Sequence, residues 1–480
     1  MVLKISAKSD TTVDELQRFC MENMGIKEKP ATKMNDEHVL DYVRQTMEFK
    51  AGRYQVRLRW RENVTLDDKN TIAEKRLIQA PPPTPPPIPH SDSSIKPLSL
   101  LCTFGYTTSY QTKYPPDGVC DYIFYDSMYK HERNTLLGTW GEDVLSMLYK
   151  ASKTDRTKTQ FGVGFAFEHR LRLLQDLANT SFRNFWDHSV FHFGILDCPA
   201  HGTTQADMNE VFQALKALDN RVQKTRASGN DSYIVLGAVS HTSAWNTYFR
   251  DRFSGFFKPD LFISLGHQVR GDPQRSSCVA TPPTILDKPE GLADAHDLYD
   301  AVRALAYVAS QAGGPRLSLS VSMAGRWSKL LPTSRVEIFS ACEKGTPSWR
   351  FFGSYTEVCN RPPFSTNLLH EAQRYAMRAF DPMTRRMLVF DDEQSLCQKL
   401  CLAKVNHTDV PFGVAVYDLD YEDTENTCSN LNSMGPYSRF EVVALAWGTD
   451  EARDVAECFS VVVAALERDP SLASLRKVLW

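Results

Sequence analysis

The chain has 480 residues, of which 42% are hydrophobic and 24% charged, and its formal net charge is −3. This composition is ordinary for a globular protein, and the length exceeds one typical domain. Lysine and arginine are scattered rather than clustered, which argues against a nucleic-acid partner and against a membrane surface. The most apolar run, Val461–Leu466, is far shorter than the roughly 20 residues that cross a bilayer, and it predicts the buried face of a helix.

The amino terminus and the cysteines point in different directions about the compartment. Residues 1–8 contain no apolar stretch of about 7–15 residues, so no secretory signal is expected in this chain as written. The eleven cysteines include no CxxC pair typical of a zinc site, and Cys397 and Cys401, one helical turn apart, suit a core as well as a ligand pair. Sequons for N-glycosylation fit a secreted chain, and they begin at Asn63, Asn179, Asn230 and Asn406.

In chain order, the first predicted unit is a small helical segment at residues 1–79. Within it, residues 13–20 and 37–43 are predicted to be helices, and the alternation of Tyr54–Trp60 predicts a strand. Residues 80–97 form a proline-rich linker, because a run of prolines favours extended polyproline II and does not pack as a helix or a central strand. This linker is expected to act as a stiff spacer.

A resemblance covers roughly residues 12–78 of that first unit. Gly25-Ile26, Phe49–Trp60 and Ala73–Leu77 resemble the linker between protease and reverse transcriptase in Pao/BEL-type retrotransposon polyproteins. The resemblance implies a non-catalytic segment of retroelement origin, captured as an exon or joined by gene prediction. A small unrelated helical cap is the alternative interpretation.

After the linker, short apolar strands alternate with amphipathic helices, which is typical of a parallel sheet wrapped by helices. The pattern predicts a (β/α)₈ TIM barrel over residues 98–440, followed by a helical extension at 441–480, with any active site at the carboxyl ends of the strands. The eight predicted strands are Leu98–Tyr106, Asp121–Asp126, Gln160–Phe167, Val190–Leu196, Tyr233–Val239, Asp260–Leu265, Arg316–Met323 and Pro411–Leu419.

Several stretches of residues 98–435 resemble family 18 glycoside hydrolases, the animal chitinases and chitinase-like proteins. In chain order they are Cys102 and Cys120 with Asp121–Tyr125, then Ala324–Trp327, Gly353–Cys359, Phe390–Ser395, and Gly413–Asp423 with Cys428. The resemblance implies a barrel of this family with a shortened insertion between strands seven and eight, at about residues 329–388. It also implies disulfides Cys102–Cys120 and Cys359–Cys428 and an extracellular protein.

The residues that the family uses for catalysis are missing from the expected place. The family motif is Asp-Gly-x-Asp-x-Asp-x-Glu at the end of strand four, where the Glu protonates the leaving oxygen and the other carboxylates orient the acetamido group of the sugar. With the glycines aligned at Gly194, the carboxylate positions are occupied by Phe193, Leu196, Cys198 and Ala200. Asp197 is one residue out of phase and is expected to face the helices, because strand side chains alternate. A one-residue bulge would instead turn Asp197 inward and bring His201 near the position of the acid.

The sugar-binding residues of the family are also depleted. Gly266, Gln268 and Val269 stand where the family has Met-x-Tyr-Asp after strand six. Of the aromatic floor that would stack on sugar rings, only Tyr417 stands in strand eight, where the family has Trp. The residues expected to contact a ligand are Tyr417, Gln268, Arg326 and Asp126.

A further group of polar residues falls just past the ends of strands three to six. It consists of Glu168, His169, His201, His241 and His267. Together with Asp418 on strand eight, these side chains suit a divalent metal that activates water. Separate solvated histidines are the favoured interpretation, because strand one supplies no His-x-His and the family uses no metal.

Three classes of function therefore stay open. The favoured one is a non-catalytic, secreted, chitinase-like module that binds an oligosaccharide or a glycoprotein as a monomer. The second is a divergent glycoside hydrolase acting on N-acetylglucosamine polymers, and the third is a metal-assisted hydrolase that uses the histidine group. No cofactor is expected.

Overall fold

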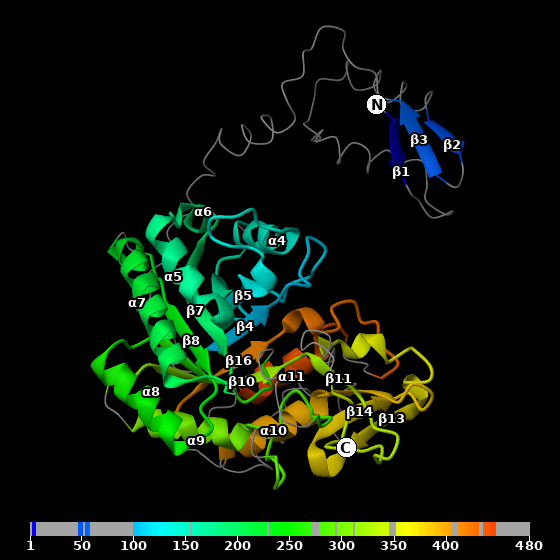
Figure 1. Cartoon of the computed structure of the whole chain (residues 1–480). Helices are drawn as coiled ribbons and strands as arrows, with labels where there is room; N and C mark the ends of the chain where they lie inside the picture. Colours follow the sequence, from blue (N-terminus) through cyan, green and yellow to red (C-terminus); the bar gives the residue numbers. More distant parts are fainter. Residues whose placement is uncertain are drawn as a thin grey trace. The chain divides into compact units, whose positions relative to one another are not determined.

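The computed structural model describes residues 2–5, 47–50, 53–57 and 99–447, apart from gaps at 154–155, 201, 228–229, 270–277, 293–294, 311–312, 345–351, 406–409 and 432–434. The chain divides into two units, residues 1–81 and 82–480 (Figure 1).

The first unit contains a three-stranded antiparallel sheet in the order β1-β3-β2. Its strands are β1 (Val2–Ile5), β2 (Met47–Lys50) and β3 (Arg53–Arg57). Strand β3 overlaps the segment Tyr54–Trp60, where alternation predicts a strand. The helices predicted at residues 13–20 and 37–43 and all of the proline-rich linker lie outside the described residues.

Eight parallel strands of the second unit close into a barrel (Figure 1). Each strand pairs with the next one along the chain, and β16 pairs with both β10 and β4 and so closes the ring. All eight match predicted strands, so the (β/α)₈ fold is confirmed. The strands are β4 (Leu100–Phe104), β5 (Tyr122–Met128), β6 (Gln160–Phe165), β7 (Val190–Cys198), β8 (Ile234–Ala238), β9 (Leu261–Ser264), β10 (Arg316–Ser322) and β16 (Gly413–Tyr417).

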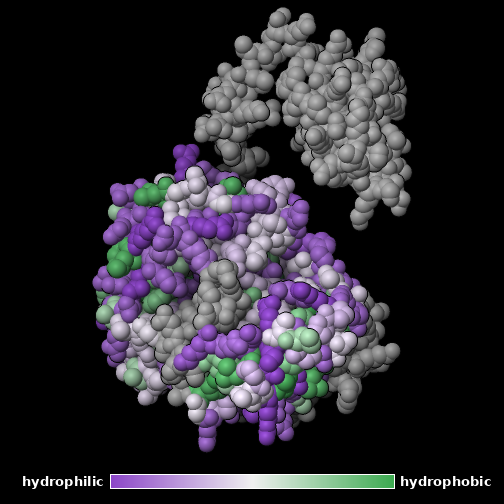
Figure 2. Space-filling view, turned by 45° about the vertical axis from the view of Figure 1, so that its right-hand side comes forward, coloured by the Kyte–Doolittle hydropathy of each residue, from purple (hydrophilic) through white to green (hydrophobic). Residues whose placement is uncertain are grey.

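The barrel strands are buried on both faces, which is why they appear in the sequence as nearly continuous apolar runs. Successive side chains alternate between two cores. Leu101 and Phe124 belong to the cluster inside the barrel, whereas their neighbours Cys102 and Ile123 belong to a larger cluster that includes helix residues such as Val302. On the face shown in Figure 2, hydrophilic residues predominate and hydrophobic residues form separate small patches.

Helices cover the outside of the barrel, although the structure describes no α-helix between β4 and β5. Two of them begin at capping residues: the Thr242 side chain accepts a hydrogen bond from the Trp245 amide, and the Asp297 side chain from the Asp300 amide. The α-helices are α4 (Glu142–Ala151), α5 (Arg170–Asn179), α6 (Arg183–Trp186), α7 (Gln205–Ala227), α8 (Ser243–Gly255), α9 (Leu298–Ala309), α10 (Glu393–Val405) and α11 (Ser438–Trp447). The boundary predicted at 440 falls inside α11, and residues 448–480 lie outside the described residues. Over the described residues, no helix is long and apolar enough to span a bilayer.

The insertion between β10 and α10 folds as a separate five-stranded antiparallel sheet, in the order β12-β11-β15-β14-β13. The insertion predicted at residues 329–388 lies within this sheet, which begins four residues earlier and ends two residues later. The strands are β11 (Gly325–Lys329), β12 (Phe352–Gly353), β13 (Leu368–Glu371), β14 (Ala376–Phe380) and β15 (Arg386–Phe390).

Both disulfides that the family resemblance implies are present. The Cα–Cα separation is 6.1 Å for Cys102–Cys120 and 5.7 Å for Cys359–Cys428. A third disulfide, Cys278–Cys342, joins two residues 64 positions apart and was not predicted. Cys401 is also disulfide-bonded, whereas Cys397 is a buried free thiol, so the two do not act as a ligand pair.

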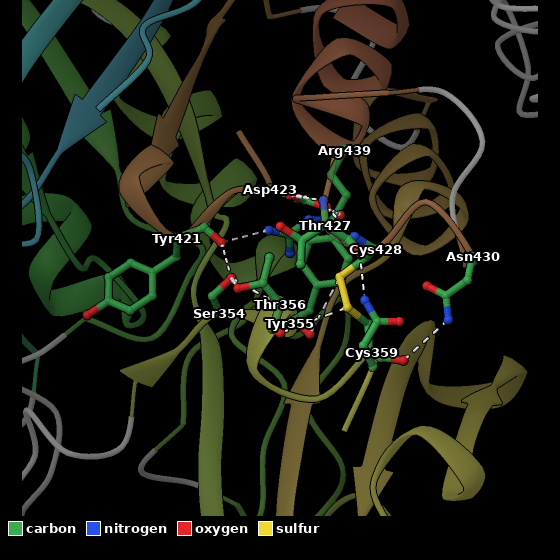
Figure 3. The surroundings of a disulfide bond; sticks show 11 residues. Ser354, Tyr355, Thr356, Cys359, Tyr421, Asp423, Thr427, Cys428, Asn430 and Arg439 are labelled. Carbon is green, nitrogen blue, oxygen red and sulfur yellow. Dashed lines mark hydrogen bonds between the residues drawn. A yellow bond between two sulfur atoms is a disulfide. The ribbon is translucent and has the colours of Figure 1, made fainter. Parts of the chain in front are cut away.

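A buried arginine ties α11 to the rest of the fold beside the Cys359–Cys428 disulfide (Figure 3). The guanidinium of Arg439, a residue only 1% exposed, lies 2.8 Å from a Glu422 carboxylate oxygen and 4.4 Å from the centre of the Tyr355 ring. It also donates hydrogen bonds to the carbonyl oxygens of Met323, at 3.0 Å, and Asp391, at 3.1 Å. Helix α11 is therefore part of the barrel and connects it to the base of the inserted sheet.

Candidate functional site at the barrel mouth

The end of β7 contains a bulge that changes which residues face the barrel mouth. Ile195 pairs with Leu236 and Cys198 pairs with Ala238, so three steps along β7 correspond to two along β8. The extra residue interrupts the alternation of side chains. The prediction that Asp197 faces the helices is therefore wrong, and the bulged alternative describes this strand.

Asp197 and Asp126 share one lysine at the mouth. The ammonium nitrogen of Lys130 lies 3.0 Å from a carboxylate oxygen of Asp126 and 3.0 Å from one of Asp197. Both aspartates are 6% exposed, and the Lys130 side chain is 10% exposed. Gly164 makes room for this arrangement, since a Cβ there would lie 2.6 Å from Asp126 Oδ1. Two carboxylates at the mouth are thus buried in an ion triad.

The loop after β5 holds Lys130 in place through an unusual backbone path. Tyr129, His131 and Glu132 all have positive φ angles, between 55° and 67°. A bulky residue such as tyrosine rarely adopts this conformation, and such residues persist where the surroundings fix them. The Tyr129 hydroxyl donates to an Asp176 carboxylate oxygen at 2.6 Å and accepts from the Leu136 amide at 3.1 Å. These contacts anchor the turn from which Lys130 reaches the two aspartates.

The triad has unequal protonation properties. Burial raises the pKa of Asp126 to about 7; the Lys130 charge opposes this shift and the Asp197 charge adds to it. Glu168 is exposed on the rim, yet its pKa is raised, first by desolvation of its carboxyl group and then by the charge of Asp197. A proton near neutral pH therefore resides on the Asp126 carboxyl for part of the time.

Tyr417 closes the centre of the barrel instead of presenting a ring face to a sugar. Only 2% of it is exposed, its hydroxyl donates to the Leu196 carbonyl oxygen at 2.7 Å, and the His267 ring centre lies 4.4 Å from its own. His267 Nδ1 lies 2.7 Å from Ser320 Oγ, and burial lowers the pKa of His267 to about 3. The expectation that Tyr417 is a stacking platform is therefore wrong, because the ring fills the barrel interior together with Leu196 and a neutral His267.

The other residues expected to bind a ligand are also engaged within the protein. Gln268 is fully buried and donates to the His296 carbonyl oxygen at 3.0 Å, so it does not reach the mouth. Arg326 is half-buried on β11, with its guanidinium 5.9 Å from the Phe352 ring centre. Asp126 is held by Lys130, as described above. Arg326 is thus the most accessible of the four.

The degenerate motif positions provide no acid. Phe193 and Cys198 are buried in the core between strands and helices, and Leu196 is buried inside the barrel. Ala200 is partly buried and packs against the interior cluster. His201 lies outside the described residues. No carboxyl group stands at the position that the family resemblance assigns to the proton donor.

The histidines proposed as metal ligands do not converge in the described part of the chain. Within the described residues, no group of three or more His, Cys, Asp or Glu side chains is arranged to hold a metal ion. His169 and His241 are half-buried, and His267 points into the barrel toward Ser320. Asp418 accepts a hydrogen bond from the Ser322 hydroxyl at 2.7 Å.

Two residues of the mouth were missed from the sequence. Lys130 lies in a loop, where no strand or helix periodicity marks it. Tyr106 follows directly after β4, is half-buried, and has its ring centre 5.9 Å from that of the exposed His131, in an edge-to-face arrangement. An aromatic residue immediately after a barrel strand is the signal that would have found Tyr106, because strand ends form the mouth.

Solved structures similar to this chain are chitinases and chitinase-like proteins. Catalytic domain 2 of the Ostrinia furnacalis Group II chitinase aligns with a TM-score of 0.53 at 11% identity, over 74% of this chain and 98% of that chain. The class V chitinase of Nicotiana tobaccum in complex with NAG4 has a TM-score of 0.51 at 11% identity, over 74% and 100%. Human YKL-39, a pseudo-chitinase with retained chitooligosaccharide binding properties, has a TM-score of 0.51 at 14% identity, over 72% and 98%. This barrel has the chitinase fold.

Comparisons of the sequence alone identify no relative of this chain. No protein-family model matches the chain. No curated protein matches it either. The resemblance of residues 12–78 to a retrotransposon linker accordingly has no support from them. At identities of 11–14%, the similarity to solved structures establishes the fold and leaves the activity to be argued from the mouth.

Proposed function

We propose that this chitinase-like barrel binds a chitin-type oligosaccharide at its mouth without hydrolysing it, as an extracellular protein. The observation that carries the proposal is the state of the mouth beside β7. The carboxylates of Asp126 in β5 and Asp197 in β7 are buried against Lys130, and neither Ala200, at the glycine-aligned acid position, nor the next residue, His201, has a carboxyl group.

Hydrolysis of a glycosidic bond needs a proton donor within hydrogen-bonding reach of the leaving oxygen. Asp126 is partly protonated near pH 7, but it is 6% exposed and its Oδ2 lies 3.0 Å from the Lys130 ammonium. Because Lys130 donates to Oδ2, the proton of a neutral Asp126 is carried by Oδ1, and that atom is buried away from a ligand at the surface. Loss of general acid catalysis typically lowers the rate by 10²–10⁴-fold.

Binding of an oligosaccharide is supported by the fold and by the rim of the mouth. Similar structures include one that binds chitooligosaccharides as a pseudo-chitinase. In this chain the half-buried Tyr106 ring and the exposed Glu168 offer the apolar face and the hydrogen-bonding group that a sugar ring requires. The disulfides are typical of proteins that fold in oxidising compartments, which supports the extracellular assignment.

The test combines an activity assay with a binding measurement on the full chain. We expect no turnover of chitin oligosaccharides above a buffer blank, and heat of binding in a calorimetric titration that Tyr106→Ala reduces. Glu168→Gln serves as a second variant on the rim. Absence of binding by the folded wild-type protein would refute the proposal.

A divergent hydrolase is the second candidate, because the observed bulge turns Asp197 toward the mouth. Turnover above the blank that is abolished by Asp197→Ala or by His201→Ala would establish it in place of the binding role. Metal analysis of the same preparation, together with loss of turnover on chelation, identifies a metal-assisted hydrolase.

A further inference from the structure

We propose that Asn179 and Asn230 are N-glycosylated, and that the attached carbohydrate covers the base of the barrel, opposite the mouth. The proposal goes beyond the oligosaccharide-binding role; it rests on the extracellular assignment proposed above and not on binding itself. It rests on the position of two sequons that the binding role leaves unexplained and on the exposure of their asparagines.

Each site has the acceptor chemistry that N-glycosylation requires. Asn179-Thr180-Ser181 and Asn230-Asp231-Ser232 both carry a serine two residues after the asparagine and no proline between them. The donor is an oligosaccharide on a lipid diphosphate, supplied by the secretory pathway. The asparagine amide nitrogen bonds to the anomeric carbon as the bond from that carbon to the diphosphate breaks. The lipid diphosphate leaves, and the amide nitrogen loses one proton.

Asn179 is the last residue of α5 and is exposed. The helix ends there because Thr180 is extended, with φ −109° and ψ 141°, and the Thr180 hydroxyl donates to the Asp176 carbonyl oxygen at 2.8 Å. Ser181 is exposed as well. The sequon thus leaves the helix end in an extended conformation, with the Asn179 and Ser181 side chains at the surface.

Asn230 lies between the end of α7 and the start of β8 and is also exposed. The Ser232 hydroxyl donates to the Phe191 carbonyl oxygen, which fixes this connection against the start of β7. The guanidinium of Arg221 on α7 donates to the carbonyl oxygen of Ala178 at 3.1 Å. Arg221, six residues before the end of α7, therefore lies beside the end of α5.

Both sequons fall in connections from a helix to the next strand. In a barrel of parallel strands these connections lie at the amino-terminal ends of the strands, whereas the active-site face is formed by the connections from strand to helix. Asp126, Lys130 and Asp197 belong to that opposite face. Glycans on Asn179 and Asn230 thus leave the mouth open, so their removal is expected to leave oligosaccharide binding unchanged.

The experiment uses the full chain behind a heterologous secretion signal in cultured animal cells. Peptide N-glycosidase converts an occupied asparagine to aspartate, which peptide mass spectrometry locates at each position. We expect conversion at Asn179 and Asn230 in the secreted protein, and loss of one glycan from each of Asn179→Gln and Asn230→Gln. Asn184→Gln is the matched control, because Asn184 is exposed on α6 at the same end but has no sequon.

The conservative variant Ser181→Thr keeps the acceptor hydroxyl at an exposed position and is expected to stay glycosylated, with the melting temperature of the wild type. Secreted, folded protein whose Asn179 and Asn230 peptides are both unconverted overturns the proposal, and conversion at one position alone overturns the other assignment. A binding titration before and after glycosidase treatment reports separately on the mouth, so failure of the binding role is distinguishable from absence of glycans.

Discussion

Replacing Lys130 by methionine tests how much the ion triad at the mouth contributes to the free energy of unfolding. Methionine keeps much of the length of the side chain and removes the ammonium group that lies 3.0 Å from both Asp126 and Asp197. Breaking a buried ion pair by removing one partner typically costs about 3–5 kcal/mol, because the other charge stays buried. Two aspartates that are each 6% exposed would lose their cation, so we expect the free energy of unfolding at pH 8 to fall by at least about 3 kcal/mol.

The loss is expected to depend on pH. The pKa of Asp126 is already raised to about 7, and removal of the lysine raises it further. At pH 5 the variant therefore holds a neutral carboxyl, which is buried at lower cost than a carboxylate. The deficit of Lys130→Met relative to wild type should accordingly be smaller at pH 5 than at pH 8.

Urea denaturation followed by circular dichroism at both pH values measures these differences. Lys113→Met is the matched control, because the Lys113 ammonium lies 2.7 Å from Glu425 but the two side chains are 58% and 59% exposed. Exposed pairs are worth about 0–1 kcal/mol. If Lys130→Met costs no more than Lys113→Met, or if its cost is the same at both pH values, the reasoning about a buried triad is refuted.

Three further substitutions address the mouth. Tyr417→Ala removes a buried ring and should lower the free energy of unfolding by about 3–5 kcal/mol, measured by thermal melts. Tyr106→Ala should leave the melting temperature nearly unchanged and weaken oligosaccharide binding by roughly 1 kcal/mol, measured by calorimetry. Asp126→Asn removes a carboxyl whose pKa is about 7 in the folded state and near 3.9 in the unfolded state. The free energy of unfolding of the wild type should therefore fall as pH rises from about 4 to 7, and that of the variant should fall less. Equal pH dependence of the two proteins in urea denaturation would contradict this.

The barrel was predictable because the physical signal for each strand is local. A strand buried on both faces requires a run of apolar residues, and each end of the eight predicted strands lies within two residues of the observed end. The Cys102–Cys120 and Cys359–Cys428 disulfides followed from the family resemblance. Cys278–Cys342 did not, because its residues lie 64 positions apart and neither belongs to a stretch that carries the resemblance.

The mouth was less predictable because its features depend on contacts distant in the sequence. The bulge in β7 is a mismatch in pairing with β8, which the alternation of β7 alone does not reveal. Tyr417 was expected to be accessible from its family position, but its hydroxyl bonds to Leu196, 221 residues away. Lys130 is placed by a turn with positive φ angles, and no residue type in the loop predicts such a turn.

Restoring a single acid should not restore chitinase activity, and Ala200→Glu tests this. A carboxyl at residue 200 would supply a proton donor, yet Cys198 and Leu196 would still stand at the positions of the carboxylates that orient the acetamido group of the sugar. Tyr417 and His267 also fill the barrel centre. General acid catalysis and positioning act on one transition state, so supplying the acid alone leaves the reacting groups unaligned. We expect turnover of chitin oligosaccharides by Ala200→Glu to stay within about tenfold of the rate measured with the wild type. A gain of 10²–10⁴-fold would show instead that the missing acid was the only defect.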